Sequence, residues 1–172
     1  MHMIIRVIVY ALNPQEAKTQ AKKVFADLCG EDRIFDYYHM FDDGHRGSNP
    51  VAIATSSVGK TLINEGMRFT KDAFRSSFKR VRKMVLLYGF FPQAWKRLFA
   101  KDKAHDFRYP CYLLGQYDGS EIWLYDHDGS GIREDGHLKN TLEKWKCLYE
   151  DAGSPNPYQG LNVYVVPADV HY

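Results

Sequence analysis

Residues 4–10, with the sequence IIRVIVY, decide the fold. Their β-branched and apolar side chains predict an inner strand of a sheet. Asn13-Pro14 follows as a helix cap with proline in the first turn, and apolar residues at three- and four-residue spacing then predict a helix that stops before Gly30. A second strand is expected at residues 34–41, because a β-branched and aromatic run ends there in Asp42-Asp43-Gly44, a turn signal.

The C-terminal third carries a second group of elements. Residues 111–117 and 121–125 are expected to form strands joined by Asp118-Gly119-Ser120, a strong hairpin signal. A helix at about 136–151 and a strand at 161–166 follow. The order of elements therefore predicts an α+β protein, a ferredoxin-like βαβ…ββαβ sandwich interrupted by a basic, mostly helical insertion.

Length and composition favour one domain. A chain of 172 residues with 45% hydrophobic residues can bury one core without disulfides or a structural metal. We therefore expect residues 1–172 to form a single domain, with a first βαβ half at 3–45, a basic helical insert at 51–108 and a second ββαβ half at 110–170.

The cysteines and the hydropathy pattern exclude several classes of protein. Three cysteines are present, an odd number, and none has the spacing of a zinc site or a redox motif. They predict small buried residues in a reducing compartment, and thus a cytoplasmic protein. No apolar run approaches the roughly 20 residues that a membrane helix needs, so no membrane partner is expected.

The charge distribution is the best functional clue in the sequence. Residues 60–108 carry 13 basic and 4 acidic side chains, whereas residues 109–172 carry 4 basic and 10 acidic ones. Clustered basic residues are the electrostatic signature of a polyanion partner, and nucleic acid is the first candidate. The alternative is a solvated helix face, partly neutralised by the acidic C-terminal third. The candidate nucleic-acid-binding residues are Lys71, Arg75, Lys79, Arg80, Arg82, Lys83, Lys96 and Arg97.

A second candidate site is a relaxed phosphate-loop pattern at residues 54–61, which ends in Gly59-Lys60-Thr61. In such a loop, backbone N–H groups surround the phosphates, and the lysine and the hydroxyl reach the terminal phosphate and Mg²⁺. The pattern has alanine where the first glycine should stand. The alternative is a helix that begins here and is capped by Ser56 or Ser57.

A third candidate site is the acidic turn at residues 126–131, DHDGSG. Its oxygen ligands at alternate positions match the first half of a calcium loop, which predicts Asp126, Asp128 and Ser130 as ligands of a divalent cation. The twelfth position is His137 where a calcium loop has glutamate, so a metal-free turn is the alternative. A small metal- or nucleotide-dependent enzyme remains the alternative function; no catalytic residue is indicated, and no other cofactor is expected.

Strand alternation predicts an aromatic face of the sheet. If Ile5, Val7 and Val9 face the flanking helices, aromatic residues gather on the opposite face. A homodimer or the inserted helices would cover this face, and a base-stacking platform is the alternative. The predicted face consists of Tyr10, Tyr112, Leu114, Trp123, Tyr125 and Tyr164. Within the insert, the spacing of Phe74, Phe78, Val81 and Val85 predicts a helix at residues 70–85. The predicted cover within the insert is the stripe Phe74, Phe78, Val81 and Trp95.

Overall fold

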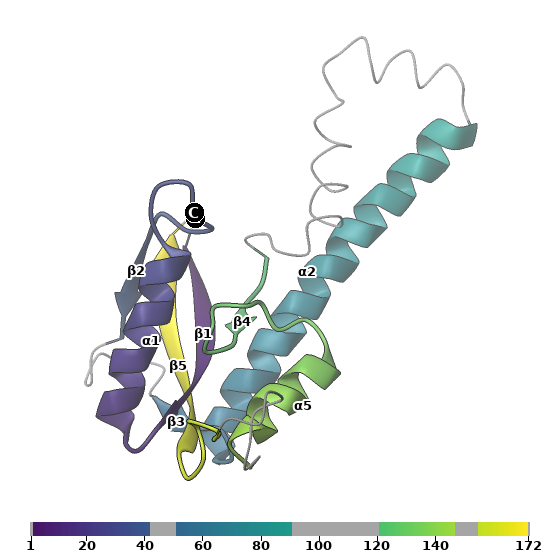
Figure 1. Cartoon of the computed structure of the whole chain (residues 1–172). Helices are drawn as coiled ribbons and strands as arrows, with labels where there is room; N and C mark the ends of the chain where they lie inside the picture. Colours follow the sequence, from purple (N-terminus) through teal and green to yellow (C-terminus); the bar gives the residue numbers. More distant parts are fainter. Residues whose placement is uncertain (1, 42–50, 91–120, 147–154, 172) are drawn as a thin grey trace.

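The computed structural model describes residues 2–41, 51–90, 121–146 and 155–171. They form a mixed α+β protein with a five-stranded sheet and three α-helices (Figure 1). In chain order the elements are β1 (His2–Ala11), α1 (Pro14–Leu28), β2 (Tyr37–Met40), β3 (Ala52–Ile53), α2 (Ser57–Phe90), β4 (Leu124–Tyr125), α5 (Asp135–Glu143) with a 3₁₀ turn at Lys144–Lys146, and β5 (Asn162–His171).

Strands β1 and β5 form the centre of the sheet. They are antiparallel and pair along their whole length, from His2 opposite His171 to Ala11 opposite Asn162. The strand order is β2-β5-β1-β4, with β3 also paired to β5, next to Val165 and Tyr164. The pairing of β4 with β1 is the one parallel pairing among the described strands, so the carboxyl ends of these two neighbouring strands lie at the same end of the sheet.

Helix α1 covers one face of the sheet. Asn13 caps it by accepting the N–H of Glu16 at 2.9 Å, and Pro14 occupies its first position, as the sequence predicts. Its buried residues pack against Val7 and Val9 of β1. The three- and four-residue spacing predicted from the sequence is confirmed in these buried residues, which are Ala17, Ala21, Val24, Phe25 and Leu28.

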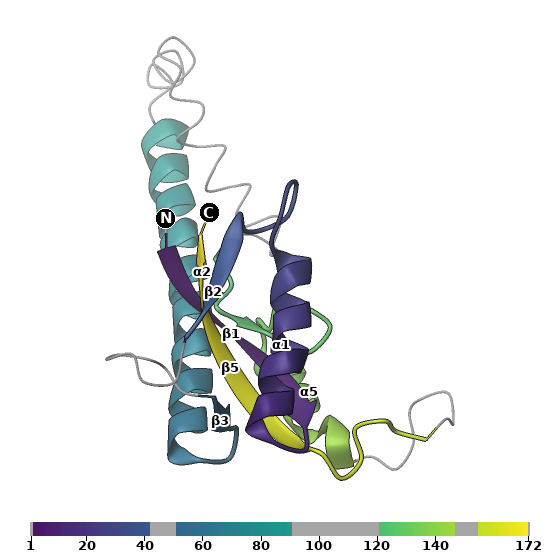
Figure 2. The ribbon, with the colours of Figure 1, turned by 90° about the vertical axis from the view of Figure 1, so that its left-hand side faces the viewer.

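Helix α2 covers the opposite face (Figure 2). Leu62, Ile63 and Met67 in its first half pack against Ile8 of β1 and Leu124 of β4. Its C-terminal turns project beyond the sheet in both views (Figures 1 and 2). The first half of this helix is therefore part of the core, and the sheet has helices on both faces.

The predicted aromatic face is wrong. Tyr125 and Tyr164 belong to the core beneath α1, whereas Tyr10 belongs to the core beneath α2. The cause is strand register, because Val7 stands opposite Tyr125 and Val9 opposite Tyr164, and residues directly opposite each other share a face. Among the described residues there is no single aromatic face that could serve as a dimer interface or a stacking platform.

The predicted cover of Trp123 is not observed among the described residues. Trp123 is half-buried, and its ring lies 6.0 Å from the ring of Phe69 on α2. Phe74 and Phe78 lie further along the helix, where it has left the sheet, and they are 39% and 53% exposed. Trp95 lies outside the described residues.

The element boundaries differ from the predictions mainly in length. Helix α2 begins at Ser57 and is much longer than the predicted helix at 70–85, and β5 extends five residues past the predicted end at 166. The predicted strand at 111–117 and its hairpin turn lie outside the described residues. A ferredoxin-like arrangement is not confirmed, because the strand order is mixed and β4 is parallel to β1.

None of the described helices is both long enough and apolar enough to cross a bilayer.

Candidate functional site: the basic ridge of helix α2

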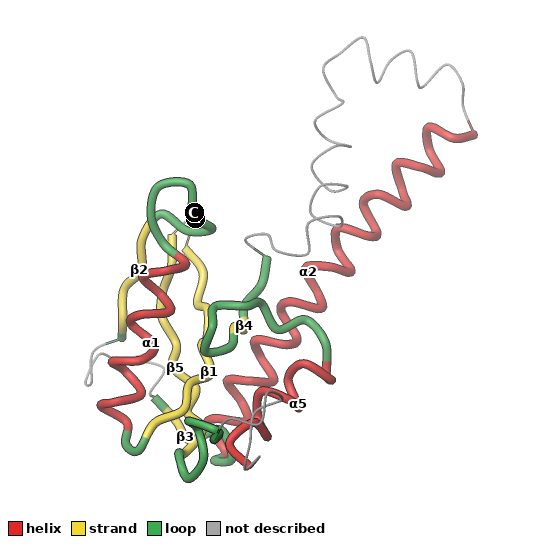
Figure 3. Tube along the Cα trace, viewed as in Figure 1, coloured by secondary structure: helices red, strands yellow, loops and turns green. Residues whose placement is uncertain are grey.

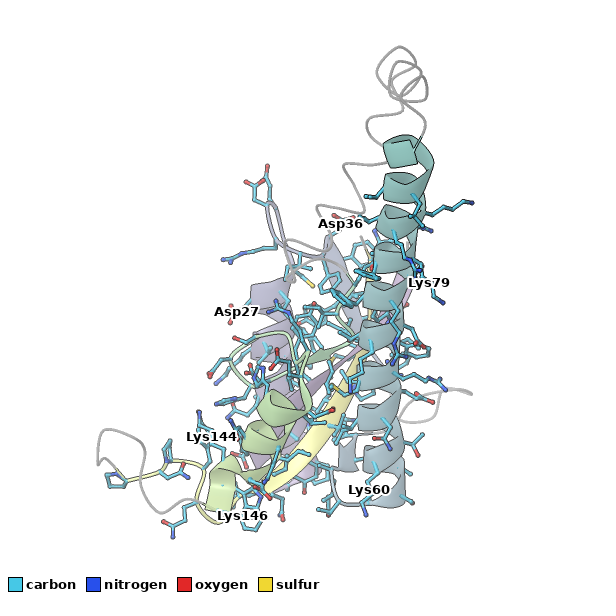
Figure 4. All side chains as sticks on the ribbon, turned by 90° about the vertical axis from the view of Figure 1, so that its right-hand side faces the viewer. Asp27, Asp36, Lys60, Lys79, Lys144 and Lys146 are labelled. Atoms are coloured by element: carbon cyan, nitrogen blue, oxygen red, sulfur yellow. The ribbon has the colours of Figure 1, made fainter. Side chains whose placement is uncertain are left out.

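Four basic residues line up along the exposed side of α2. They are spaced by seven, four and three residues, which is close to whole turns of a helix with roughly 3.6 residues per turn. The buried residues Leu62, Gly66, Thr70 and Ser77 lie on the other side of the helix. We call this line the basic ridge, and it consists of Arg68, Arg75, Lys79 and Arg82, all of which are exposed. Figure 4 shows Lys79 on the side of α2 that faces away from α1 and the sheet.

Most of the positive charge of the basic ridge is not neutralised by acidic side chains among the described residues. Arg75 Nη1 lies 3.3 Å from Asp72 Oδ1, but both side chains are more than half exposed. Such a pair contributes little and is screened by salt. Lys79 and Arg82, and Lys83 beside them, form no ion pair with another described residue, so their charges are available to a ligand.

Two of the predicted basic residues point elsewhere. Lys71 Nζ lies 2.8 Å from Asp135 Oδ1 at the start of α5. Arg80 lies near Glu121: burial raises the pKa of this carboxyl group, and the hydrogen bond from Ser77 and the positive charge of Arg80 partly offset the rise. The Lys71–Asp135 pair connects α2 to α5. Lys96 and Arg97 lie outside the described residues.

Arg68 extends the ridge towards the body of the protein and is not among the basic residues predicted from the sequence. Its guanidinium carbon lies 5.0 Å from the centre of the Phe69 ring. The predicted helix begins at residue 70, so it excludes Arg68. In a helix that begins at Ser57, the seven-residue spacing between Arg68 and Arg75 places both residues on the same side.

The acidic turn follows β4 as part of a loop that leads to α5 (Figure 3), and the side chain of its first residue, Asp126, closes it. Asp126 is buried, and its Oδ1 accepts the backbone N–H groups of Asp128 at 3.0 Å and Ser130 at 2.9 Å. Its Oδ2 lies 3.0 Å from Nε2 of His137, on the following helix. These contacts give Asp126 a structural role, because each oxygen already has a partner.

His127 is the least expected residue of this turn. Its side chain is 12% exposed, and its Nε2 lies 3.1 Å from Lys144 Nζ and 3.4 Å from Asp128 Oδ2. Burial lowers the pKa of the imidazole, the Asp128 carboxylate raises it in part, and Lys144 lowers it further. Burial thus favours the neutral form of the imidazole.

The geometry changes the candidate ligand set for a metal. Ligand atoms of Asp126, His127 and Asp128 all lie within 4.8 Å of one another, whereas the predicted set contained Ser130 in place of His127. Lys144 stands next to the imidazole nitrogen, and its positive charge opposes a cation there. The arrangement is explained as a hydrogen-bonded acidic turn, and the metal site stays a prediction.

Residues 59–61 form the first turn of α2. Ser56 caps the helix by accepting the N–H of Gly59 at 3.0 Å, which agrees with the predicted capping alternative. The N–H of Lys60 also bonds within the turn, to the Ser56 carbonyl oxygen at 2.9 Å, and the Thr61 hydroxyl donates to Ser57 O. Two backbone donors that a phosphate loop would direct at its ligand are thus already engaged.

The fold and the ridge together define a class of protein: an α+β sheet protein with helices on both faces and a basic helix that projects from the body. A protein-family model described as "Domain of unknown function (DUF7995)" matches residues 1–172. The chain belongs to this family. No curated protein and no solved structure matches it.

Proposed function

We propose that this is a non-enzymatic polyanion-binding protein, with nucleic acid as the first candidate ligand, and that α2 provides the binding surface. The observation that carries the proposal is the basic ridge, in which Arg68, Arg75, Lys79 and Arg82 are exposed on one side of the helix. Clustered cations on one element bind phosphates through the release of condensed counterions, without reading the sequence of bases. A cytoplasmic location is part of this proposal.

The dimensions of the ridge suit a nucleic acid. Arg68 and Arg82 are fourteen residues apart, or about 21 Å at a rise of 1.5 Å per residue. Duplex DNA carries roughly 12 phosphates over that length, at one charge per 1.7 Å of its axis. The four cations can therefore contact several phosphates at once.

The body of the protein holds this helix in place. The Arg6 guanidinium on β1 binds Glu65 on α2 at 2.8 Å, and Thr70 Oγ1 accepts the N–H of Trp123 at 3.0 Å. Both contacts lie in or next to the half of α2 that packs on the sheet. The end of the ridge at Arg68 is thus held against the body of the protein, which reduces the entropy lost when this part of the helix binds a ligand.

Self-association is the competing proposal. Phe78 and Val85 are 53% and 52% exposed, and they are seven residues apart on α2. A seven-residue repeat of apolar positions is typical of helices that pair with another helix. The mass of the protein in solution, measured by light scattering with and without nucleic acid, separates the two proposals.

A matched pair of triple variants tests the proposal by fluorescence anisotropy with labelled DNA and RNA. Arg75→Gln, Lys79→Gln and Arg82→Gln remove three charges from the ridge. Lys22→Gln, Arg33→Gln and Lys139→Gln remove three exposed charges elsewhere. We expect binding at low salt to weaken much more in the ridge variant than in the control variant. Equal weakening in both variants would mean that only net charge matters, and absence of binding by the wild-type protein would refute the proposal.

A further inference from the structure

A cavity of about 310 Å³ opens where β1 and β4 end, and it is a second candidate site. Val9 and Tyr10 of β1 line it together with His127 and Asp128 of the turn after β4. The two strands are parallel, and ligands of open α/β sheets bind outside the carboxyl ends of parallel strands. The volume is at the lower end of the range for small-molecule sites.

The charge of the cavity selects the kind of ligand. Among the described residues, the three carboxylates of Glu16, Asp27 and Asp128 line it, together with the ammonium group of Lys23. Lys144 adds a second positive charge next to His127, so one negative charge remains in excess. Glu16 already accepts the backbone N–H of Leu12 at 2.9 Å. Asp27 and Asp128 are exposed, so their oxygens can reach a ligand in the cavity. A net negative lining favours a cation.

Aromatic rings form the inner part of this lining. The rings of Tyr10, His127 and Tyr158 lie within 4.5–4.9 Å of one another, centre to centre. Lys144 Nζ lies 4.8 Å from the centre of the Tyr158 ring, so this ring already accepts an ammonium group of the chain itself. Aromatic faces attract cations, above all organic cations that can also bury apolar groups.

We propose that the cavity at the carboxyl ends of β1 and β4 binds a small organic cation. Its amine or guanidine group binds the carboxylates of Asp27 and Asp128, and its apolar part contacts the rings of Tyr10 and Tyr158. This proposal is independent of nucleic-acid binding, because the ridge lies on the far side of α2. Figure 4 shows Asp27 and Lys79 on opposite sides of the molecule.

Isothermal titration of nucleic-acid-free protein tests the proposal with three probes: agmatine, tyramine and choline. Succinate serves as the probe of opposite charge. We expect at least one amine to bind, and Asp27→Asn or Asp128→Asn to weaken it by roughly tenfold or more, the value of a charged hydrogen bond. Glu31→Gln is the matched control, since Glu31 is exposed and does not line the cavity.

Three outcomes would overturn the proposal. One is that none of the three cations binds. Another is that Asp27→Asn and Asp128→Asn bind as tightly as the control variant while circular dichroism shows all of them folded. The third is that succinate binds in preference to the cations, which would make the cavity an anion site.

Discussion

Replacing Glu65 with alanine is expected to lower the free energy of unfolding by about 3 kcal/mol, because it leaves a buried cation without its counter-charge. The Arg6 side chain is only 3% exposed. Its Nη2 lies 2.8 Å from Glu65 Oε2, and its Nη1 donates to the Ile4 carbonyl oxygen at 2.8 Å. Removing one partner of a buried pair typically costs about 3–5 kcal/mol. Glu65 is 38% exposed, so water can reach the site and the lower figure applies.

Replacing Arg6 is expected to destabilise the protein less than replacing Glu65. Arg6→Met removes the buried charge itself and fills a similar volume, so it should cost less than Glu65→Ala, and Glu65→Ala should cost little when added to Arg6→Met. Urea denaturation followed by circular dichroism measures all three variants. Asp72→Ala is the control, since its pair with Arg75 is exposed and should contribute less than about 0.5 kcal/mol. A cost of Glu65→Ala no larger than that of Asp72→Ala would refute the reasoning.

Two further predictions concern the start of α2 and the turn after β4. Gly59→Ala should lower the melting temperature, because the added carbon would collide with the Ile53 carbonyl oxygen. Gly136→Ala is the control and should not lower the melting temperature, because nothing lies near the added carbon. Equal melting temperatures of the two variants would contradict this prediction. The free energy of unfolding should fall as the pH drops below about 6.5, the ordinary pKa of histidine, because burial lowers the pKa of His127 and the unfolded chain takes up the proton first. His127→Asn should remove this part of the slope, and an unchanged slope would show that other groups cause it.

The first half of the fold could be predicted from the sequence because local signals determine it. The Asn13-Pro14 cap and the apolar spacing of α1 depend on neighbours within one helix, and both are confirmed. The residues of β1 also form a strand as predicted, and its apolar side chains are buried on both faces. Parallel pairing and long-range order are not encoded in such local patterns.

The faces of the sheet could not be predicted, because they depend on register. Alternation states which residues of one strand share a face, but it does not state which face of the next strand they join. Val7 pairs with Tyr125, and this pairing across more than a hundred residues placed Tyr125 on the opposite face from the one predicted. The same limitation applies to Trp123, whose neighbour is Phe69 and not the stripe further along α2.

The candidate sites also divide into features that depend on local sequence and features that depend on long-range contacts. Clustering of charge along α2 is a local property, so the basic segment is predictable from the sequence, although Lys71 pairs with Asp135 from elsewhere in the chain and Arg80 lies near Glu121. The cavity could not be predicted at all. It depends on bringing Asp27 of α1 and Asp128 of the acidic turn into the lining of one cavity, which only the folded chain does.

The salt dependence of nucleic-acid binding tests the central claim most directly. For duplex DNA, the logarithm of the binding constant falls with the logarithm of salt concentration, with a slope of about 0.9 per phosphate contact. We expect a steep slope for the wild-type protein. The variant with Arg75→Gln, Lys79→Gln and Arg82→Gln should have a slope shallower by up to about 2.7, or roughly one contact per residue. Identical slopes in the two proteins, or wild-type binding that does not depend on salt, would contradict the assignment of α2 as the polyanion-binding surface.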